Sequence, residues 1–148
     1  MRHLTISLED DLAESFDQLI EEKGYQSRSE AFRDLLRGAL GEQKLRAGKA
    51  RHCVGVLSYV YNHHERQLAS RLVGMQHDHH DVTVSTMHAH LDHDNCIETV
   101  ILRGRTDAVL AFAEAVKAQS GVRHGTFHPI PIDMDAGPAK HSHAKPHT

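Results

Sequence analysis

The 148-residue chain has no tryptophan, only two cysteines and few aromatic residues. Two cysteines cannot build the disulfide framework of a small secreted domain, so we expect a reducing, cytoplasmic location. No run of 18 apolar residues occurs, and the N-terminus lacks the apolar segment of a signal peptide, which predicts a chain without a membrane span. The formal net charge of −3 excludes a globally basic surface, so any contact with nucleic acid requires a local patch.

Histidine, in contrast, is abundant, with 15 residues that concentrate in the second half of the chain. Within residues 77–96 the candidate metal ligands are His77, His79, His80, His88, His90, His93 and Cys96. Side chains alternate along the strand predicted at 82–90, so His88 and His90 share a face. Cys96 reaches that face if the hairpin loop spans 91–95 or carries a bulge, whereas a strict four-residue loop places it on the other face.

Two imidazoles and a thiolate suit zinc, copper or nickel and not calcium or magnesium. The hairpin therefore predicts a site for a transition metal. The alternative is a polar hairpin whose histidines are simply solvated.

The first fifty residues predict one strand followed by two helices. Apolar and polar side chains alternate from Arg2 to Leu8, then recur at helical spacing until Gly24, and a capping box at Ser27-Arg28-Ser29-Glu30 opens the second helix. A lone strand leaves its backbone unpaired, and about 50 residues bury too little surface to fold alone. The sequence therefore predicts a dimer with two paired strands, as in a ribbon-helix-helix DNA-binding domain.

In that domain the outward face of the ribbon would read bases through His3, Thr5 and Ser7. Arg28 and Ser29, at the start of the second helix, would contact a phosphate, because that helix end offers free backbone amides. The alternative is that the polar face is solvated and contacts no DNA.

Residues 52–132 predict a second domain with the element order βαββαβ, which is typical of a ferredoxin-like fold. Its expected strands are 53–61, 81–90, 96–102 and 121–130, and its expected helices are 65–76 and 106–119. The fold class is thus α+β, with a ribbon-helix-helix domain over residues 1–48 followed by the ferredoxin-like domain.

Two segments outside these elements differ in composition. Gly41 to Arg51 is basic and loses the apolar stripe, which predicts a frayed helix end and a linker. Residues 133–148 are rich in Pro, Ala, Gly and His and are expected to be a disordered tail with solvated histidines.

From Met1 to about Ile130 the chain resembles the nickel-responsive transcriptional regulators called NikR. The stretches that carry the resemblance are Leu4-Thr5-Ile6-Ser7-Leu8, Ser27-Arg28-Ser29-Glu30-Ala31, Leu57-Ser58-Tyr59-Val60-Tyr61, Gln76 to Asp81, and His88 to Cys96. The resemblance implies a homotetramer, a dimer of dimers, in which two DNA-binding dimers flank four ACT-type ferredoxin-like domains. It also implies that the nickel-loaded protein binds palindromic operator DNA and represses genes for nickel uptake.

The ligand set is likewise an implication of the resemblance. His88, His90 and Cys96 of one subunit and His77 of its neighbour would form a square-planar site for one Ni²⁺ per subunit, leaving His79, His80, His93 and Cys53 outside it. Glu30 and Asp34 would hold a second, potassium-like cation, which would relieve the repulsion of like charges four residues apart on a helix.

One departure concerns the base-reading trio. His3 stands where better-known members of the family carry arginine, so the resemblance does not determine the operator preference, while the expected architecture is unaffected. The alternatives to a nickel-dependent repressor are a repressor of the same architecture that senses another metal, and a metal-storage or metal-delivery protein without DNA binding. An enzyme is not expected, because the Cys and His cluster leaves no evident open position or general base.

Overall fold

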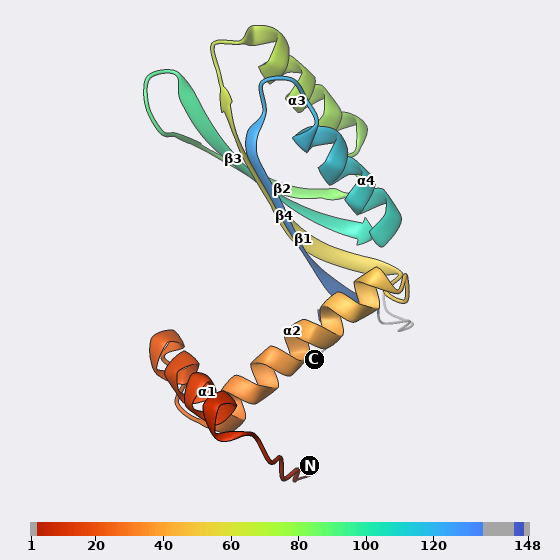
Figure 1. The fold of residues 1–148 in the computed structure, drawn as a ribbon. Coiled ribbons are helices and arrows are strands. Elements are labelled where there is room, and N and C mark those ends of the chain that lie inside the picture. The colour runs from red at the N-terminus through yellow and green to blue at the C-terminus, as the bar shows by residue number, and fades with distance from the viewer. Residues whose placement is uncertain (1–2, 135–143, 147–148) are drawn as a thin grey trace. The chain divides into compact units, whose positions relative to one another are not determined.

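The computed structural model describes residues 3–134 and 144–146. The chain divides into two compact units, Met1–Leu40 and Gly41–Thr148, each of which is described by itself (Figure 1). In the described part of the chain, every helix is too short or too polar to cross a membrane.

The first unit contains helix α1, Asp10–Lys23, and most of helix α2, Arg28–Arg46. Gly24 ends α1 in the left-handed conformation, with φ of 72°, and its N–H donates to carbonyls of the last turn. The predicted cap of α2 by Ser27 is confirmed, because its Oγ accepts from the Glu30 amide at 3.2 Å. Glu30 Oε2 accepts from the amide of Gln26, one residue before the cap, at 3.0 Å.

Over its described residues, 3–8, the strand predicted from Arg2 to Leu8 does not form in the single chain. Residues 3–9 have no regular secondary structure, and Leu4 and Ile6 are 77% and 51% exposed. Of the described residues before Gly41, Ala31 alone is buried. The physical reason is that a ribbon strand needs a partner for its backbone hydrogen bonds, and one copy supplies none. Leu12 of α1 and Leu35, Leu36 and Leu40 of α2 are also exposed.

The second unit is an antiparallel sheet with two helices, and it confirms the predicted βαββαβ order. Its elements are β1 His52–Asn62, α3 Arg66–Asp78, β2 Thr83–His90, β3 Asn95–Arg105, α4 Thr106–Lys117, β4 Arg123–Met134 and a short β5, Ala144–Pro146. The strand order is β2-β3-β1-β4-β5. The fold of the described chain is thus α+β.

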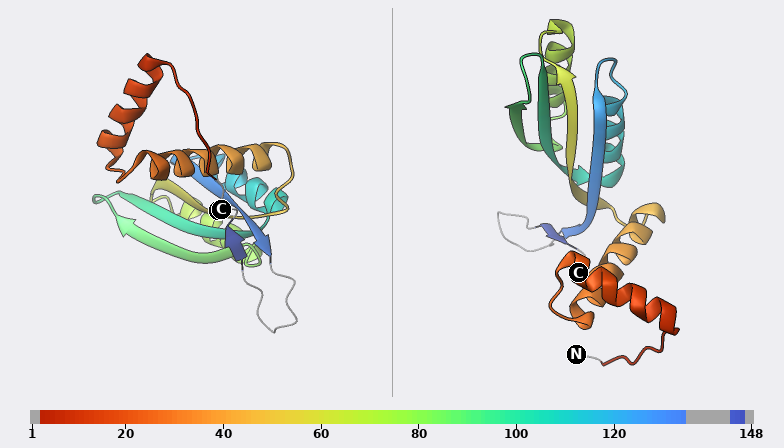
Figure 2. Two further views of the ribbon diagram at one scale, coloured as in Figure 1. Left: turned by 90° about the horizontal axis from the view of Figure 1, so that it is seen from below. Right: turned by 60° about the vertical axis from the view of Figure 1, so that its left-hand side comes forward.

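Helices α3 and α4 cover one face of this sheet (Figures 1 and 2). The core lies between them and the sheet, where Leu57, Leu68, Val100 and Phe112 are almost fully buried. Alternation along β1 explains this arrangement, because Leu57, Tyr59 and Tyr61 face the helices whereas Val56 is exposed on the other side.

The expectations for the two polar segments need correction. Helix α2 stays regular to Arg46, because Leu45 packs on the core of the second unit, so the basic linker is shorter than predicted. Residues 133 and 134 continue β4, and residues 144–146 pair with it, so these parts of the predicted tail are ordered by strand pairing. The tail residues His141, His143 and His147 lie outside the described residues.

Candidate metal centre

The β2–β3 hairpin brings the predicted ligands to one face of the sheet. His90 lies opposite Cys96 and His88 lies opposite Glu98 in the antiparallel register. The loop therefore spans residues 91–95, which is the register that the metal hypothesis requires. On the other side of β3, Tyr61 pairs with Cys96 and Tyr59 pairs with Glu98, so these side chains all point to the helix-covered face.

Two side chains, those of His63 and His90, converge on Cys96 within the single chain. His63 Nδ1 lies 3.1 Å from Cys96 Sγ, and His90 Nδ1 lies 3.6 Å from it. The ligand atoms of all three residues lie within 4.8 Å of one another. Two imidazoles and a thiol sulfur at this spacing fit a nickel, copper or zinc ion. We call these three residues the Cys96 cluster.

Sequence reasoning missed His63. It follows the last residue of β1, where Asn62 pairs with Asn95, so it comes to the tip of the hairpin only through the β1–β3 register. The sequence pattern does not reveal that register. The available signal was the position of His63 two residues after Tyr61, because Tyr61 lies in the strand that pairs with Cys96.

His88 lies beside the Cys96 cluster rather than in it. Its ring is edge-on to that of His90, with 5.2 Å between centroids, and its Nδ1 lies 3.5 Å from Glu98 Oε2 and 3.5 Å from the hydroxyl of Tyr61. The side chain is partly exposed and turned toward these buried acceptors. Bringing its nitrogen to an ion shared with Cys96 therefore requires a side-chain rotation.

His77 is exposed in the last turn of α3 and joins no group of candidate ligands within the described residues of one chain. The two histidines after it are engaged locally. His79 Nδ1 lies 2.9 Å from the carbonyl of Met75, and its ring packs on Phe112, while His80 Nδ1 lies 3.2 Å from the carbonyl of His77.

Glu98 forms a buried polar network behind the hairpin. Its carboxylate is 6% exposed and accepts hydrogen bonds from the hydroxyls of Tyr59 (2.5 Å) and Tyr61 (3.2 Å) and from the side-chain amide of Gln76 (2.5 Å). Thr86 Oγ1 donates to Gln76 Oε1 at 2.7 Å, which satisfies the other end of that amide. A buried carboxylate is tolerated only with such partners, so the network fixes α3 against β2 and β3.

The electrostatics of the centre favour a protonated Cys96 thiol next to a neutral His63 imidazole. Burial, and then the negative charges of Glu98 and Asp92, raise the pKa of Cys96. Burial, and then the neighbouring His64 and His90, lower the pKa of His63. Burial beside Glu98 raises the pKa of Tyr61 to about 12, so this hydroxyl stays a donor. A metal ion that binds the Cys96 thiolate must therefore displace a proton.

Cys53, the second cysteine, is fully buried in the core, and burial raises the pKa of its thiol. It lies near the start of β1, while the Cys96 cluster lies beyond the end of that strand. Its surroundings are those of a packed core residue.

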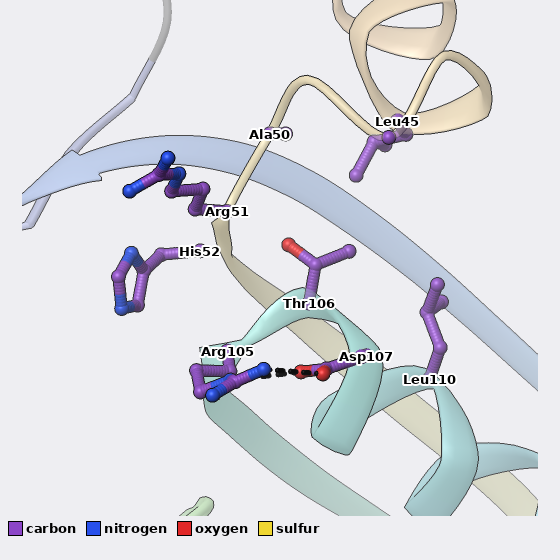
Figure 3. Close-up of a pocket in the computed structure, with 9 residues that line it drawn as sticks. Leu45, Ala50, Arg51, His52, Arg105, Thr106, Asp107 and Leu110 are labelled. Atoms are coloured by element: carbon purple, nitrogen blue, oxygen red, sulfur yellow. Dashed lines mark hydrogen bonds and ion pairs between the residues drawn. The ribbon is translucent and has the colours of Figure 1, made fainter.

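A pocket of about 600 Å³ also opens near the start of β1 and is not part of the metal centre (Figure 3). Arg51, His52 and Thr106 line it, and Arg105 forms an ion pair with Asp107 at its edge. It contains no thiolate and no cluster of candidate ligands.

In the first unit the predicted DNA-contacting residues are exposed: His3, Thr5, Ser7, Arg28 and Ser29. Arg28 is held by Asp17 through two hydrogen bonds, with Nε 2.7 Å from Oδ1 and Nη2 2.5 Å from Oδ2. This contact lowers the pKa of Asp17 and orients the guanidinium at the start of α2.

The two carboxylates predicted to hold a second cation have partners within the chain. Asp34 accepts a hydrogen bond from the hydroxyl of Tyr25 at 2.5 Å, and Glu30 caps the turn before α2. The like-charge repulsion noted from the sequence is thus partly offset by these neutral donors.

Comparison with known proteins gives consistent results over both units. The family described as the NikR C terminal nickel binding domain matches residues 54–130, and the family described as ribbon-helix-helix protein, copG family, matches residues 2–43. The chain is 50% identical over 132 residues to the nickel-responsive regulator of Brucella suis biovar 1 (strain 1330), covering 89% of this chain and all of the relative. It is 49% identical over the same length and coverage to the nickel-responsive regulator of Brucella melitensis biotype 1.

A solved structure of an uncharacterized protein from Thermotoga maritima superposes with a TM-score of 0.47 at 16% identity, covering 53% of this chain and 96% of that one.

Proposed function

This chain belongs to the NikR family of nickel-responsive regulators, and on that basis we propose that it is a nickel-sensing transcriptional repressor that binds palindromic operator DNA when metal-loaded. The observation that carries the proposal is the pairing of His90 with Cys96 in a hairpin that lies inside the matched nickel-binding domain. Family membership as a regulator argues against an enzyme. The cytoplasm is the proposed location, because repression requires access to DNA.

We assign the nickel ligands to His88, His90 and Cys96 of one subunit and His77 of a neighbouring subunit, one ion per subunit. Three observations support this set: His90 and Cys96 are opposed, His88 is two residues from His90 on the same face, and exposed His77 has no ligand partner among the described residues of its own chain. When bound, nickel would act as a Lewis acid that accepts lone pairs from one thiolate and three imidazoles. A site shared between subunits requires at least a dimer, and we propose that the full assembly is a homotetramer.

The Glu98 network supplies the link from this site to the rest of the domain. Gln76 directly precedes His77 in α3 and binds the carboxylate that also neighbours His88. Side chains that move at the hairpin therefore change the anchoring of the C-terminal end of α3. We propose that metal loading orders this helix end and shifts the population of tetramers toward those in which both DNA-binding dimers engage one operator.

DNA recognition is assigned to the ribbon. His3, Thr5 and Ser7 would project into the major groove once two copies pair, and Arg28 and Ser29 would contact phosphates. The exposure of these residues and the absence of a regular strand in the single chain support the need for a dimer. Glu30 and Asp34 are the candidates for a potassium-like cation. The regulated genes are proposed to be those of nickel uptake.

A DNA-selection experiment tests this function. Random duplexes are selected with the full-length protein in nickel and in chelator, and the enriched sequence is then titrated in both conditions. The proposal expects a palindromic sequence enriched only with nickel. Enrichment of the same sequence in chelator would contradict nickel sensing, and no enrichment in either condition would favour a storage or delivery protein.

A further inference from the structure

A second cluster of candidate ligands lies next to the Cys96 cluster, on the more exposed side of the hairpin. It consists of His64, in the loop after β1, and His93 and Asp94, in the tip between β2 and β3. We propose that these three residues form a separate site for a divalent transition ion of the zinc type. We call it the outer site.

The candidate ligand atoms already lie close together in the single chain. The candidate nitrogen and oxygen atoms of the three side chains lie within 4.8 Å of one another. His64 Nε2 is 3.6 Å from Asp94 Oδ1, and the rings of His64 and His93 have centroids 5.3 Å apart. An ion about 2.0–2.2 Å from each atom fits with small side-chain rotations.

Hydrogen bonds hold the backbone of the outer site in place before any metal binds. Asp92 Oδ1 accepts hydrogen bonds from the amides of Asp94 and Asn95, both at 2.8 Å, which holds the hairpin tip. The amide of His63 donates to the carbonyl of Asp94 at 3.0 Å, so the tip and the loop after β1 are joined directly. The ligands therefore need no rearrangement of the chain to meet an ion, which lowers the entropic cost of binding.

The donor set determines the class of ion. Two imidazoles and one carboxylate suit zinc and its first-row neighbours, whereas magnesium and calcium prefer oxygen ligands. All three side chains are exposed, so water completes the coordination. The outer site contains no thiolate, which separates its chemistry from that of the Cys96 cluster and makes it the weaker of the two.

Occupancy would add a cross-link between two segments. The ion would join the tip of the β2–β3 hairpin to the loop that leads into α3 at Arg66. Because the rings of His63 and His64 are in contact, with centroids 4.2 Å apart, the outer site borders the Cys96 cluster without sharing a ligand with it. Because the outer site is the weaker of the two, it fills only when metal is in excess.

Anomalous diffraction from crystals of the full-length protein in excess zinc chloride tests the outer site. We expect a zinc peak between His64, His93 and Asp94 in addition to a peak at Cys96. The variants Asp94→Asn and His93→Gln should each lose the outer peak and keep the inner one, while Cys96→Ala should show the reverse. His128→Gln, which removes an exposed histidine on β4, is the matched control and should keep both peaks.

Calorimetric titration with zinc chloride provides the solution measurement. The weaker class of sites should fall by one per chain in Asp94→Asn and His93→Gln and stay unchanged in His128→Gln. An outer peak and a weak-site count that survive both substitutions would overturn the proposal, as would a wild-type crystal with a peak at Cys96 alone. Operator binding in nickel, measured on the same variants, tests the proposed repressor function. The two proposals can therefore fail independently of each other.

Discussion

The side-chain amide of Gln76, in the last turns of α3, donates a 2.5 Å hydrogen bond to the buried carboxylate of Glu98 on β3. Glu98 in turn lies opposite His88, whose Nδ1 is 3.5 Å from the same carboxylate. One side chain therefore contacts both the helix end that carries His77 and the strand that carries the proposed ligands. In the proposed mechanism, this contact connects metal binding to the order of the helix end.

Gln76→Ala should uncouple metal binding from the order of the C-terminal end of α3. The substitution removes a hydrogen bond to a charged group, worth about 1.5–3 kcal/mol, and leaves Glu98 with its tyrosine donors. We expect nickel still to bind, while the gain in hydrogen-exchange protection of residues 66–78 on nickel addition becomes much smaller. Gln67→Ala, an exposed glutamine of the same helix, is the control and should behave as the parent. Parental protection in Gln76→Ala would show that Glu98 does not connect the two elements.

Cys96→Ala should abolish tight nickel binding and leave the fold intact. The thiolate is the one anionic ligand of the proposed four, and its loss removes the strongest attraction for the ion. Cys53→Ala is a matched control, because both thiols are fully buried and only one is near the histidines. Equilibrium dialysis with nickel, with circular dichroism for the fold, measures the effect. Loss of binding in Cys53→Ala but not in Cys96→Ala would refute the assigned centre.

The proposal favours His88 over His63 as the nickel ligand, although His63 is nearer to Cys96 in the single chain. His88→Gln should lower nickel affinity by more than the roughly 10–100-fold that is typical of losing a residue that only supports a ligand. His63→Gln should lower it by less than that. Nickel titrations against a competing chelator measure both. The opposite ranking would assign the ion to the Cys96 cluster of one subunit.

Thr5→Ala should weaken binding to the selected operator by about 1 kcal/mol and leave random DNA unaffected, because its hydroxyl and methyl groups contact base edges. Arg28→Ala should weaken binding to every sequence and reduce the dependence on salt, because it removes a phosphate contact. Fluorescence anisotropy at several salt concentrations separates the two effects. If Thr5→Ala binds both DNAs as the parent does, the ribbon is not the reading element.

The sequence predicted the hairpin, the shared face of His88 and His90 and the order of the six elements, because these follow from local alternation and spacing. It did not predict His63, since that residue reaches Cys96 only through pairing between strands about 40 residues apart along the chain. The network around Glu98 was missed for the same reason. The strand predicted at 2–8 does not form over its described residues, 3–8, because its hydrogen bonds require a second copy.

The most direct test of the account is an operator titration of the apo, nickel and zinc forms, with hydrogen exchange measured over residues 62–81. Nickel accepts four ligands in a plane, whereas zinc prefers a tetrahedron, so zinc should bind the thiolate without anchoring His77 in the same way. We predict that nickel alone both tightens operator binding and protects this segment, and that operator DNA raises nickel affinity by the same factor. Equal operator affinity and equal protection with zinc and nickel would contradict the account.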